Sequence, residues 1–226
     1  MNSAIVLAGG SSTRMGAKVD KAFLPLGPKP VVAYSLRVFQ DCPDIDSIVL
    51  VVRKEQLVAA KGLVQMFGIS KIHDIVAGGN NRQSSVRAGL AALDPDTKYV
   101  AVHDAARPNL QGEFLEELLK AARKTGAAIA ATPMVDTVKL TAKAGIVSET
   151  LDRSKIWAAQ TPQVFRVSLL SQALEKADRE KLEVTDDAQA VELAGGEVRL
   201  VSNPTPNPKI TVPEDLRTVG LLMGIH

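Results

Sequence analysis

The sequence predicts an α/β protein with three layers, in which helices flank a mostly parallel β-sheet. Short apolar runs of strand length recur along the chain, and segments with helical periodicity separate them. Polar, glycine-containing loops follow several of the apolar runs. This alternation is typical of parallel sheets with both faces covered by helices, so we expect a Rossmann-like arrangement.

The predicted elements alternate in chain order. The strand-like runs are Ala4–Leu7, Ser47–Val52, Ile72–Val76, Tyr99–Val102, Ala127–Ala131 and Glu197–Val201. The helical segments are Val31–Phe39, Glu55–Met66, Gln83–Leu93, Glu113–Lys124, Val167–Ala177, Asp186–Leu193 and Pro213–Leu222. Proline is favoured in the first turn of a helix, which supports a final helix beginning at Pro213. Ser84 or Ser85 could cap the third helix.

The region Thr137–Gln160 departs from this rhythm. Short alternating pieces surround a turn at Lys143–Gly145, which predicts a β-hairpin arm. A hairpin alone cannot bury both of its faces, so we expect the arm to meet a second copy of the chain in a homodimer. The alternative is a surface flap packed on its own sheet. We expect residues 1–226 to form one domain with the arm as a subregion.

Composition excludes several classes of protein. The 226 residues are 46% hydrophobic, and 27 basic residues nearly balance 25 acidic ones, so neither nucleic acid nor an anionic membrane is an expected partner. The apolar runs are too short to span a membrane, and no secretory signal is recognisable, which predicts a cytoplasmic protein. The single Cys42 and three scattered histidines argue against an internal disulfide and a Cys/His zinc site.

The loop after the first predicted strand is the strongest functional signal. It contains Gly9 and Gly10, then Arg14 and Lys21. Glycine lets backbone N–H groups approach a phosphate closely, and the two cations suit a nucleoside triphosphate. The spacing fits neither a Walker loop nor a dinucleotide fingerprint. Without the two cations, the glycine pair would indicate only a tight turn.

Two further polar loops follow predicted strands, Gly78–Ser85 and His103–Pro108. Ligands of such sheets bind beyond the carboxyl ends of the strands, so we expect the three loops to share one crevice. Asp104 is a candidate contact for magnesium or ribose, because magnesium in triphosphate sites takes one or two carboxylates. The alternative is an Asp104–Arg107 pair that only fixes the loop. We interpret His103 as a packing or hydrogen-bonding residue.

Four later residues could bind a phosphorylated acceptor, although each has a structural alternative. Thr161 and Thr185 supply hydroxyls, and Arg153 and Lys209 supply cations. Thr185 could instead belong to a helix cap, Arg153 to a salt bridge of the arm, and Lys209 to a solvated loop.

Together, these motifs make the chain resemble the cytidylyltransferases of the nucleotidyltransferase superfamily, most closely the 2-C-methyl-D-erythritol 4-phosphate cytidylyltransferase family of the non-mevalonate isoprenoid pathway. The resemblance covers essentially the whole length. It rests on Leu7-Ala-Gly-Gly10 with Arg14-Met15 and Lys21, Ala77-Gly-Gly79 with Ser85 to Leu90, Val102 to Pro108, Asp136-Thr137, Trp157 to Gln163, Thr185 to Asp187 and Lys209 to Leu216.

The resemblance implies a role for each candidate residue. Arg14 and Lys21 would be catalytic, stabilising charge on the α-phosphate of CTP, with Mg²⁺ as cofactor. The residues that would surround CTP are Leu7, Ala8, Gly9, Gly10, Gly79, Ser85, Asp104 and Ala105. Those that would hold the polyol phosphate acceptor are Thr137, Arg153, Thr161, Thr185 and Lys209. Arg153 and Lys209 would grip the acceptor's phosphate, and the arm would cross to the partner chain.

Three alternatives stay open at this point. A ribitol 5-phosphate cytidylyltransferase has the same build and a similarly short polyol phosphate acceptor. A molybdenum-cofactor guanylyltransferase shares the first loop, but should lack the strings Asp104–Pro108 and Gln160–Gln163. A catalytically silent nucleotide-binding domain should have lost Arg14 or Lys21, and both are present.

Overall fold

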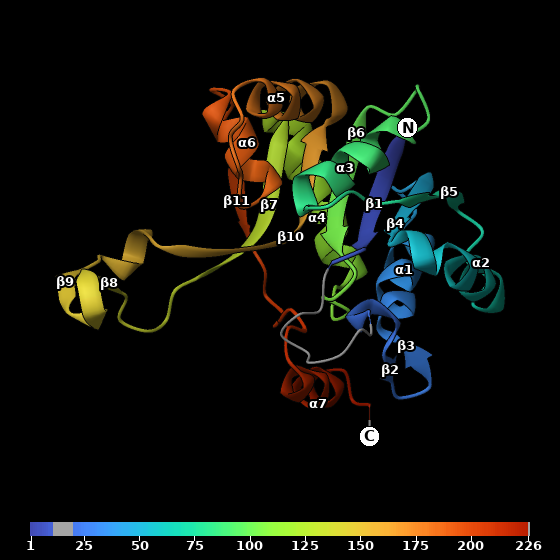
Figure 1. The fold of residues 1–226 in the computed structure, drawn as a ribbon, viewed down its shortest axis with the longest axis horizontal. Coiled ribbons are helices and arrows are strands. Elements are labelled where there is room, and N and C mark those ends of the chain that lie inside the picture. The colour runs from blue at the N-terminus through green and yellow to red at the C-terminus, as the bar shows by residue number, and fades with distance from the viewer. Residues whose placement is uncertain (11–19, 226) are drawn as a thin grey trace.

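A computed structural model describes residues 1–10 and 20–225, and a seven-stranded sheet forms its centre (Figure 1). In sheet order the strands are β11 (Arg199–Ser202), β7 (Ala127–Pro133), β10 (Trp157–Arg166), β6 (Tyr99–Asp104), β1 (Asn2–Ala8), β4 (Ser47–Val52) and β5 (Ile72–Ala77). Strand β10 is antiparallel to both β6 and β7, and the other neighbouring strands are parallel. The predicted three-layer α/β class is confirmed.

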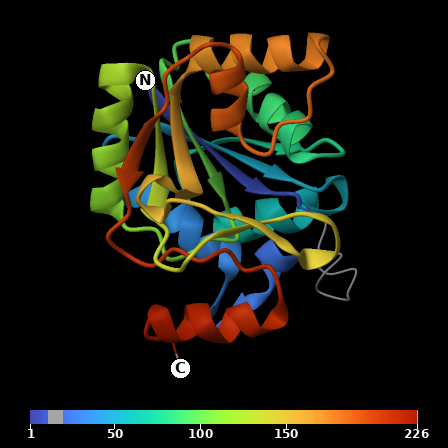
Figure 2. The ribbon, with the colours of Figure 1, turned by 90° about the vertical axis from the view of Figure 1, so that its left-hand side faces the viewer.

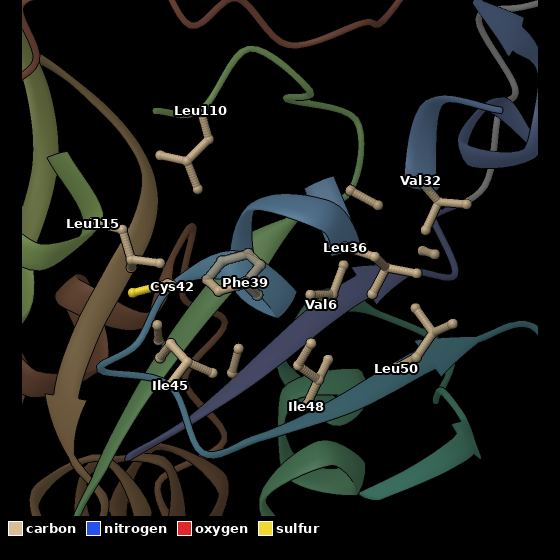
Figure 3. Close-up of a cluster of buried hydrophobic side chains, with 14 of the residues drawn as sticks. Val6, Val32, Leu36, Phe39, Cys42, Ile45, Ile48, Leu50, Leu110 and Leu115 are labelled. Carbon is tan, nitrogen blue, oxygen red and sulfur yellow. The ribbon is translucent and has the colours of Figure 1, made fainter. Parts of the chain in front are cut away.

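Helices cover both faces of the sheet (Figure 2). One face carries α1 (Val31–Asp41), α2 (Leu57–Met66) and α4 (Gly112–Thr125), and the other carries α3 (Arg82–Ala91), α5 (Val167–Arg179) and α6 (Asp187–Leu193). On the first face, Leu36 and Phe39 pack against the strand residues Ile48 and Leu50 (Figure 3). All four side chains are fully buried, and such burial is the main force that holds helices on a sheet.

Strand β10 has no counterpart among the predicted strands. Its middle contains Gln160-Thr-Pro-Gln163, and proline is unusual inside a sheet. The structure accommodates this stretch in an irregularity, because the pairing of β10 with β7 shifts register between Ala159 and Gln163. The central position of β10 therefore depends on tertiary pairing that local propensity does not reveal.

A smaller layer lies beyond the carboxyl ends of the parallel strands (Figure 1). It consists of α7 (Pro213–Leu222) and the short strands β2 (Pro25–Leu26) and β3 (Lys29–Pro30), joined by a separate apolar cluster that includes Leu26, Ile210 and Val219. The Asp215 carboxylate accepts hydrogen bonds from the backbone N–H groups of Thr211 and Val212, at 2.6 and 2.9 Å. As predicted, α7 begins at Pro213.

The predicted arm contains a hairpin of β8 (Lys139–Thr141) and β9 (Val147–Thr150), which pair antiparallel. The last residues of the predicted range, from Trp157 on, already belong to β10. Figure 1 shows the arm extending away from the sheet and its helices. Its exposed apolar side chains are Leu140, Ile146, Val147 and Trp157, and the exposed Val135 lies just before it. Within residues 1–10 and 20–225, every helix is too short or too polar to cross a membrane.

Candidate active site

The carboxyl ends of the central strands bring three of the predicted loops together. Leu7 of β1 stands opposite Asp104 of β6, and Ala8 stands opposite Val52 of β4. Val52 in turn stands opposite Ala77, the last residue of β5. The backbone N–H of Ala105 donates to the carbonyl oxygen of Leu7 at 2.9 Å, which ties the ends of β1 and β6 together. Parallel pairing is thus the reason that these loops share one edge of the sheet.

The structure describes the two ends of the first loop: Gly9 and Gly10 follow β1, and Asp20 precedes Lys21. Lys21 begins a 3-10 turn, Lys21–Phe23, and the carboxylate of Asp20 caps this turn by accepting a hydrogen bond from Ala22 N at 3.2 Å. The Asp20 side chain faces inward, and burial raises the pKa of its carboxyl. The turn thereby fixes the backbone of Lys21. Arg14, the other predicted catalytic cation, lies outside the described residues.

The loop after β5 is built around Ser85. Its hydroxyl donates to the carbonyl oxygen of Asn81 at 2.8 Å and accepts from the N–H of Gly79 at 3.2 Å. A Cβ atom at Gly79 would collide with the side chain of Ser84, so glycine is required there. The cap of α3 is neither of the two predicted serines: the side chain of Asn81 accepts from Ser84 N at 2.8 Å, and the Ser84 hydroxyl accepts from Asn81 N.

Asp104 lies between two cations. Its Oδ2 is 2.5 Å from Nζ of Lys209, and its Oδ1 is 3.5 Å from Nε of Arg82. Burial alone would raise the pKa of Asp104, but Arg82 and Lys209 outweigh it and hold that pKa well below its usual range. The carboxylate is therefore ionised at neutral pH, and it neutralises part of the positive charge of Arg82 and Lys209.

The two ion pairs of Asp104 argue against its predicted role as a metal ligand. Both carboxylate oxygens already face a cation, so a directly bound Mg²⁺ would have to displace Lys209. Among the residues that the structure describes, no group of three or more His, Cys, Asp or Glu side chains could hold a metal ion. At the position of Asp104, the described residues thus do not fit a directly bound magnesium ion.

His103 and Thr161 hold the backbone of Asp104 in place through a chain of hydrogen bonds. The Nε2 atom of His103 lies 3.1 Å from the carbonyl oxygen of Arg107, which can only accept, so Nε2 carries the proton. Burial lowers the pKa of His103 to about 4, so at neutral pH its Nδ1 accepts the hydrogen bond from the Thr161 hydroxyl at 3.1 Å. The Thr161 Oγ1 in turn accepts from Asp104 N at 3.0 Å. As predicted, His103 is a packing and hydrogen-bonding residue.

The predicted acceptor residues fall into two groups. Thr161 and Lys209 lie at the strand ends, and Thr185 is exposed nearby in the chain before α6. Thr137 and Arg153 are on the arm, where the guanidinium of Arg153 donates to the carbonyl oxygen of Val135 at 2.5 Å. Thr161 is only 5% exposed and its proton points to His103, so it cannot donate to a bound acceptor.

Gln163 carried no prediction, and Arg107 carried only the alternative of a pair with Asp104, whose carboxylate faces Arg82 and Lys209 instead. The amide of Gln163 accepts from the backbone N–H of Asp187 and Ala188, at 3.2 Å each, and donates to Asp186. Arg107 donates to the carbonyl oxygen of Asn207 at 2.7 Å and fixes the loop before Lys209. These contacts join segments that are far apart in the sequence. The only sequence signal for Gln163 and Arg107 is that polar residues stand among apolar ones.

Known proteins resemble this chain over nearly its whole length. The family described as 2-C-methyl-D-erythritol 4-phosphate cytidylyltransferase matches residues 2–224. A protein of that name from Dehalococcoides mccartyi is 44% identical over 220 residues, which cover 97% of this chain and 95% of that protein. Another, from Desulforamulus reducens, is 41% identical over 214 residues, covering 94% and 92% of the two chains.

A solved structure agrees with these relatives. The crystal structure of 4-diphosphocytidyl-2C-methyl-D-erythritol synthase from Anaerococcus prevotii superposes with a TM-score of 0.88 at 31% identity, covering 99% of this chain and 98% of that one. Sequence and structure comparisons thus agree on the family over nearly the whole chain. The chain therefore belongs to the 2-C-methyl-D-erythritol 4-phosphate cytidylyltransferase family.

Proposed function

We propose that this protein transfers the cytidylyl group of CTP to the phosphate of 2-C-methyl-D-erythritol 4-phosphate. An oxygen of the acceptor phosphate attacks the α-phosphorus of CTP in line, the bond to the β-phosphate breaks, and pyrophosphate leaves. The acceptor phosphate is already an anion at neutral pH, so no nucleophile from the protein is required. Family membership supports the reaction, and the meeting of three loops at the ends of β1, β5 and β6 supports the site.

In this proposal, catalysis consists of orientation and charge stabilisation. Lys21 and Arg14 stabilise the negative charge that gathers on the α-phosphate. Gly9, Gly10, Gly79 and Ser85 surround the nucleotide with backbone N–H groups and one hydroxyl. The remaining proposed CTP contacts, Leu7, Ala8, Asp104 and Ala105, line the same strand ends.

In this proposal, the triphosphate of CTP holds the Mg²⁺ ion, and the protein does not bind the ion directly. Mg²⁺ keeps several waters and binds readily to substrate phosphates, where it neutralises charge. Asp104 is paired with Arg82 and Lys209, so we expect it to stay outside the ion's direct ligands. Removal of the metal by EDTA should abolish turnover and excess Mg²⁺ should restore it, whereas turnover that persists in EDTA would contradict a metal requirement.

The acceptor site is proposed to be completed by a second copy of the chain. Lys209 lies at the strand ends, whereas Arg153 and Thr137 lie on the arm that extends from the body (Figure 1). If the arm crosses to a partner, its Arg153 can grip the acceptor phosphate together with the partner's own strand-end cation. We propose Thr185 as a further acceptor contact and Thr161 as an indirect one that holds Asp104.

Pyrophosphate release from CTP tests the reaction. Purified protein with Mg²⁺ and CTP should release pyrophosphate with 2-C-methyl-D-erythritol 4-phosphate and much less with D-ribitol 5-phosphate. Faster pyrophosphate release with D-ribitol 5-phosphate would support the same cytidylyl transfer with a different acceptor. No pyrophosphate release with either acceptor would contradict the proposal and favour a non-catalytic nucleotide-binding role. A cytoplasmic location stays a prediction, which cell fractionation would check.

Lys21→Ala and Arg14→Ala test the two catalytic cations. Each should lose on the order of 2.7–4 kcal/mol of transition-state stabilisation if it acts like an oxyanion-hole donor, which is roughly a 10²–10³-fold loss of kcat. Lys61→Ala is the control, because Lys61 is exposed on α2. The measurement is steady-state pyrophosphate release. Unchanged kcat in both variants would overturn the proposed mechanism.

A further inference from the structure

Arg82 joins two carboxylates of the site. It is the first residue of α3, and its guanidinium lies 2.8 Å from Asp187 through Nη2 and 3.5 Å from Asp104 through Nε. Lys209 binds the other oxygen of Asp104. The result is a chain of alternating charges, from Lys209 to Asp104, Arg82 and Asp187, that runs from the partly exposed Lys209 to the buried Asp187.

Asp187 is the fixed end of this chain. Its side chain is only 1% exposed, and its backbone N–H is held by Gln163 at 3.2 Å, at the start of α6. An ionised carboxylate buried this deeply is costly unless a cation pairs with it. Arg82 supplies that cation. The planar guanidinium has several donors in a fixed geometry, so one side chain can face both carboxylates, which a lysine ammonium could not do as rigidly.

Asp104 is the shared partner of this chain, because one of its oxygens faces Arg82 and the other faces Lys209. With Arg82 present, Oδ1 of Asp104 faces the guanidinium at 3.5 Å and only Oδ2 contacts Lys209, so the negative charge is shared between two cations. Without Arg82, the carboxylate can turn fully towards Lys209 and cancel more of its charge. The position of Arg82 therefore governs how much positive charge Lys209 offers to a phosphate.

We propose that Arg82 is a positioning residue for acceptor binding: anchored by Asp187, it holds Asp104 so that Lys209 stays available to the acceptor phosphate. This inference rests on the proposed function. Arg82 acts through Asp104 and need not touch either substrate. Its loss should therefore change the use of the acceptor far more than the binding of CTP.

A double variant separates this role from a purely structural one. Arg82→Met alone leaves Asp187 buried and unpaired, so a loss of activity could reflect poor folding. Arg82→Met with Asp187→Asn removes both charges, keeps the net charge, and leaves no unpaired ion. We expect its melting temperature to be close to that of the unaltered protein. We expect its kcat/KM for 2-C-methyl-D-erythritol 4-phosphate to fall by about ten- to a hundredfold, as for a misplaced positioning contact, with little change in KM for CTP.

The same helix offers a matched control. Arg87 of α3 forms an ion pair with Asp178, and both side chains are substantially exposed. Arg87→Met with Asp178→Asn should leave both kinetic constants near those of the unaltered protein. Arg82→Lys gives a second measurement, because it keeps a charge beside Asp187 and should still raise the acceptor KM.

If R82M/D187N folds and keeps the kcat/KM of the unaltered protein for the acceptor, the positioning role is overturned. In that case the unaltered protein is still active, so the proposed function is not contradicted. If the double variant does not fold, an unchanged acceptor KM in Arg82→Lys would overturn the role instead. An unaltered protein that is inactive with every acceptor would overturn the proposed function, and this inference with it.

Discussion

At the scale of single residues, His103 should make stability depend on pH. Burial lowers its pKa from 6.5 to about 4 in the folded protein, so as pH falls the unfolded chain takes up a proton first. The contribution of neutral His103 is complete above pH 6.5 and is lost as pH falls towards 4, an effect of about 3 kcal/mol at most. His103→Gln should be less stable at neutral pH and should lose less stability between pH 6.5 and 4.5 in urea unfolding. Equal losses in the two proteins would contradict this, since every other titrating group is present in both proteins.

At the scale of elements, the start of α3 places both Ser85 and Arg82, and Asn81 caps it. Asn81→Ala removes the acceptor for Ser84 N and should cost about 1 kcal/mol of unfolding free energy, the usual value of an N-cap. Because Gly79 N and Asn81 O both bond to the Ser85 hydroxyl, we also expect weaker CTP binding.

Urea unfolding and CTP titration measure the two effects. Asn80→Ala, at the exposed neighbouring position, is the stability control, and an equal loss there would argue against the cap.

At the scale of the whole molecule, the arm should control assembly and acceptor use together. Val147 is 53% exposed on the arm, and Val58 is 84% exposed on α2, so aspartate at the two positions makes a matched pair. Val147→Asp should shift the protein from dimer to monomer in sedimentation velocity and lower acceptor turnover, since Arg153 would no longer reach a partner's site. Val58→Asp should do neither. A monomeric unaltered protein, or a dimer insensitive to Val147→Asp, would contradict the proposed dimer.

Local patterns predicted the helices α1–α7 and six of the seven strands of the central sheet. The fully buried run Ser47–Val52 appears as β4 with the predicted bounds, and Pro213 begins α7 as expected. Strand β10 was missed because Pro162 and its polar neighbours interrupt its apolar pattern. The cap of α3 was assigned to the wrong residue, since Asn81, Ser84 and Ser85 are all good capping types and only backbone geometry distinguishes them.

The fold class, the strand-end loops and the family could be predicted from the sequence, because they depend on residue types at short, fixed spacings. The ion pairs could be found only in the folded protein. Asp104 is separated from Lys209 by more than a hundred residues, and parallel pairing together with the loop held by Arg107 brings them to 2.5 Å. The same packing turned Thr161 towards His103 and placed Arg82 between two carboxylates. Ion pairs of this kind depend on three-dimensional distance and burial, and neither quantity is encoded in local spacing.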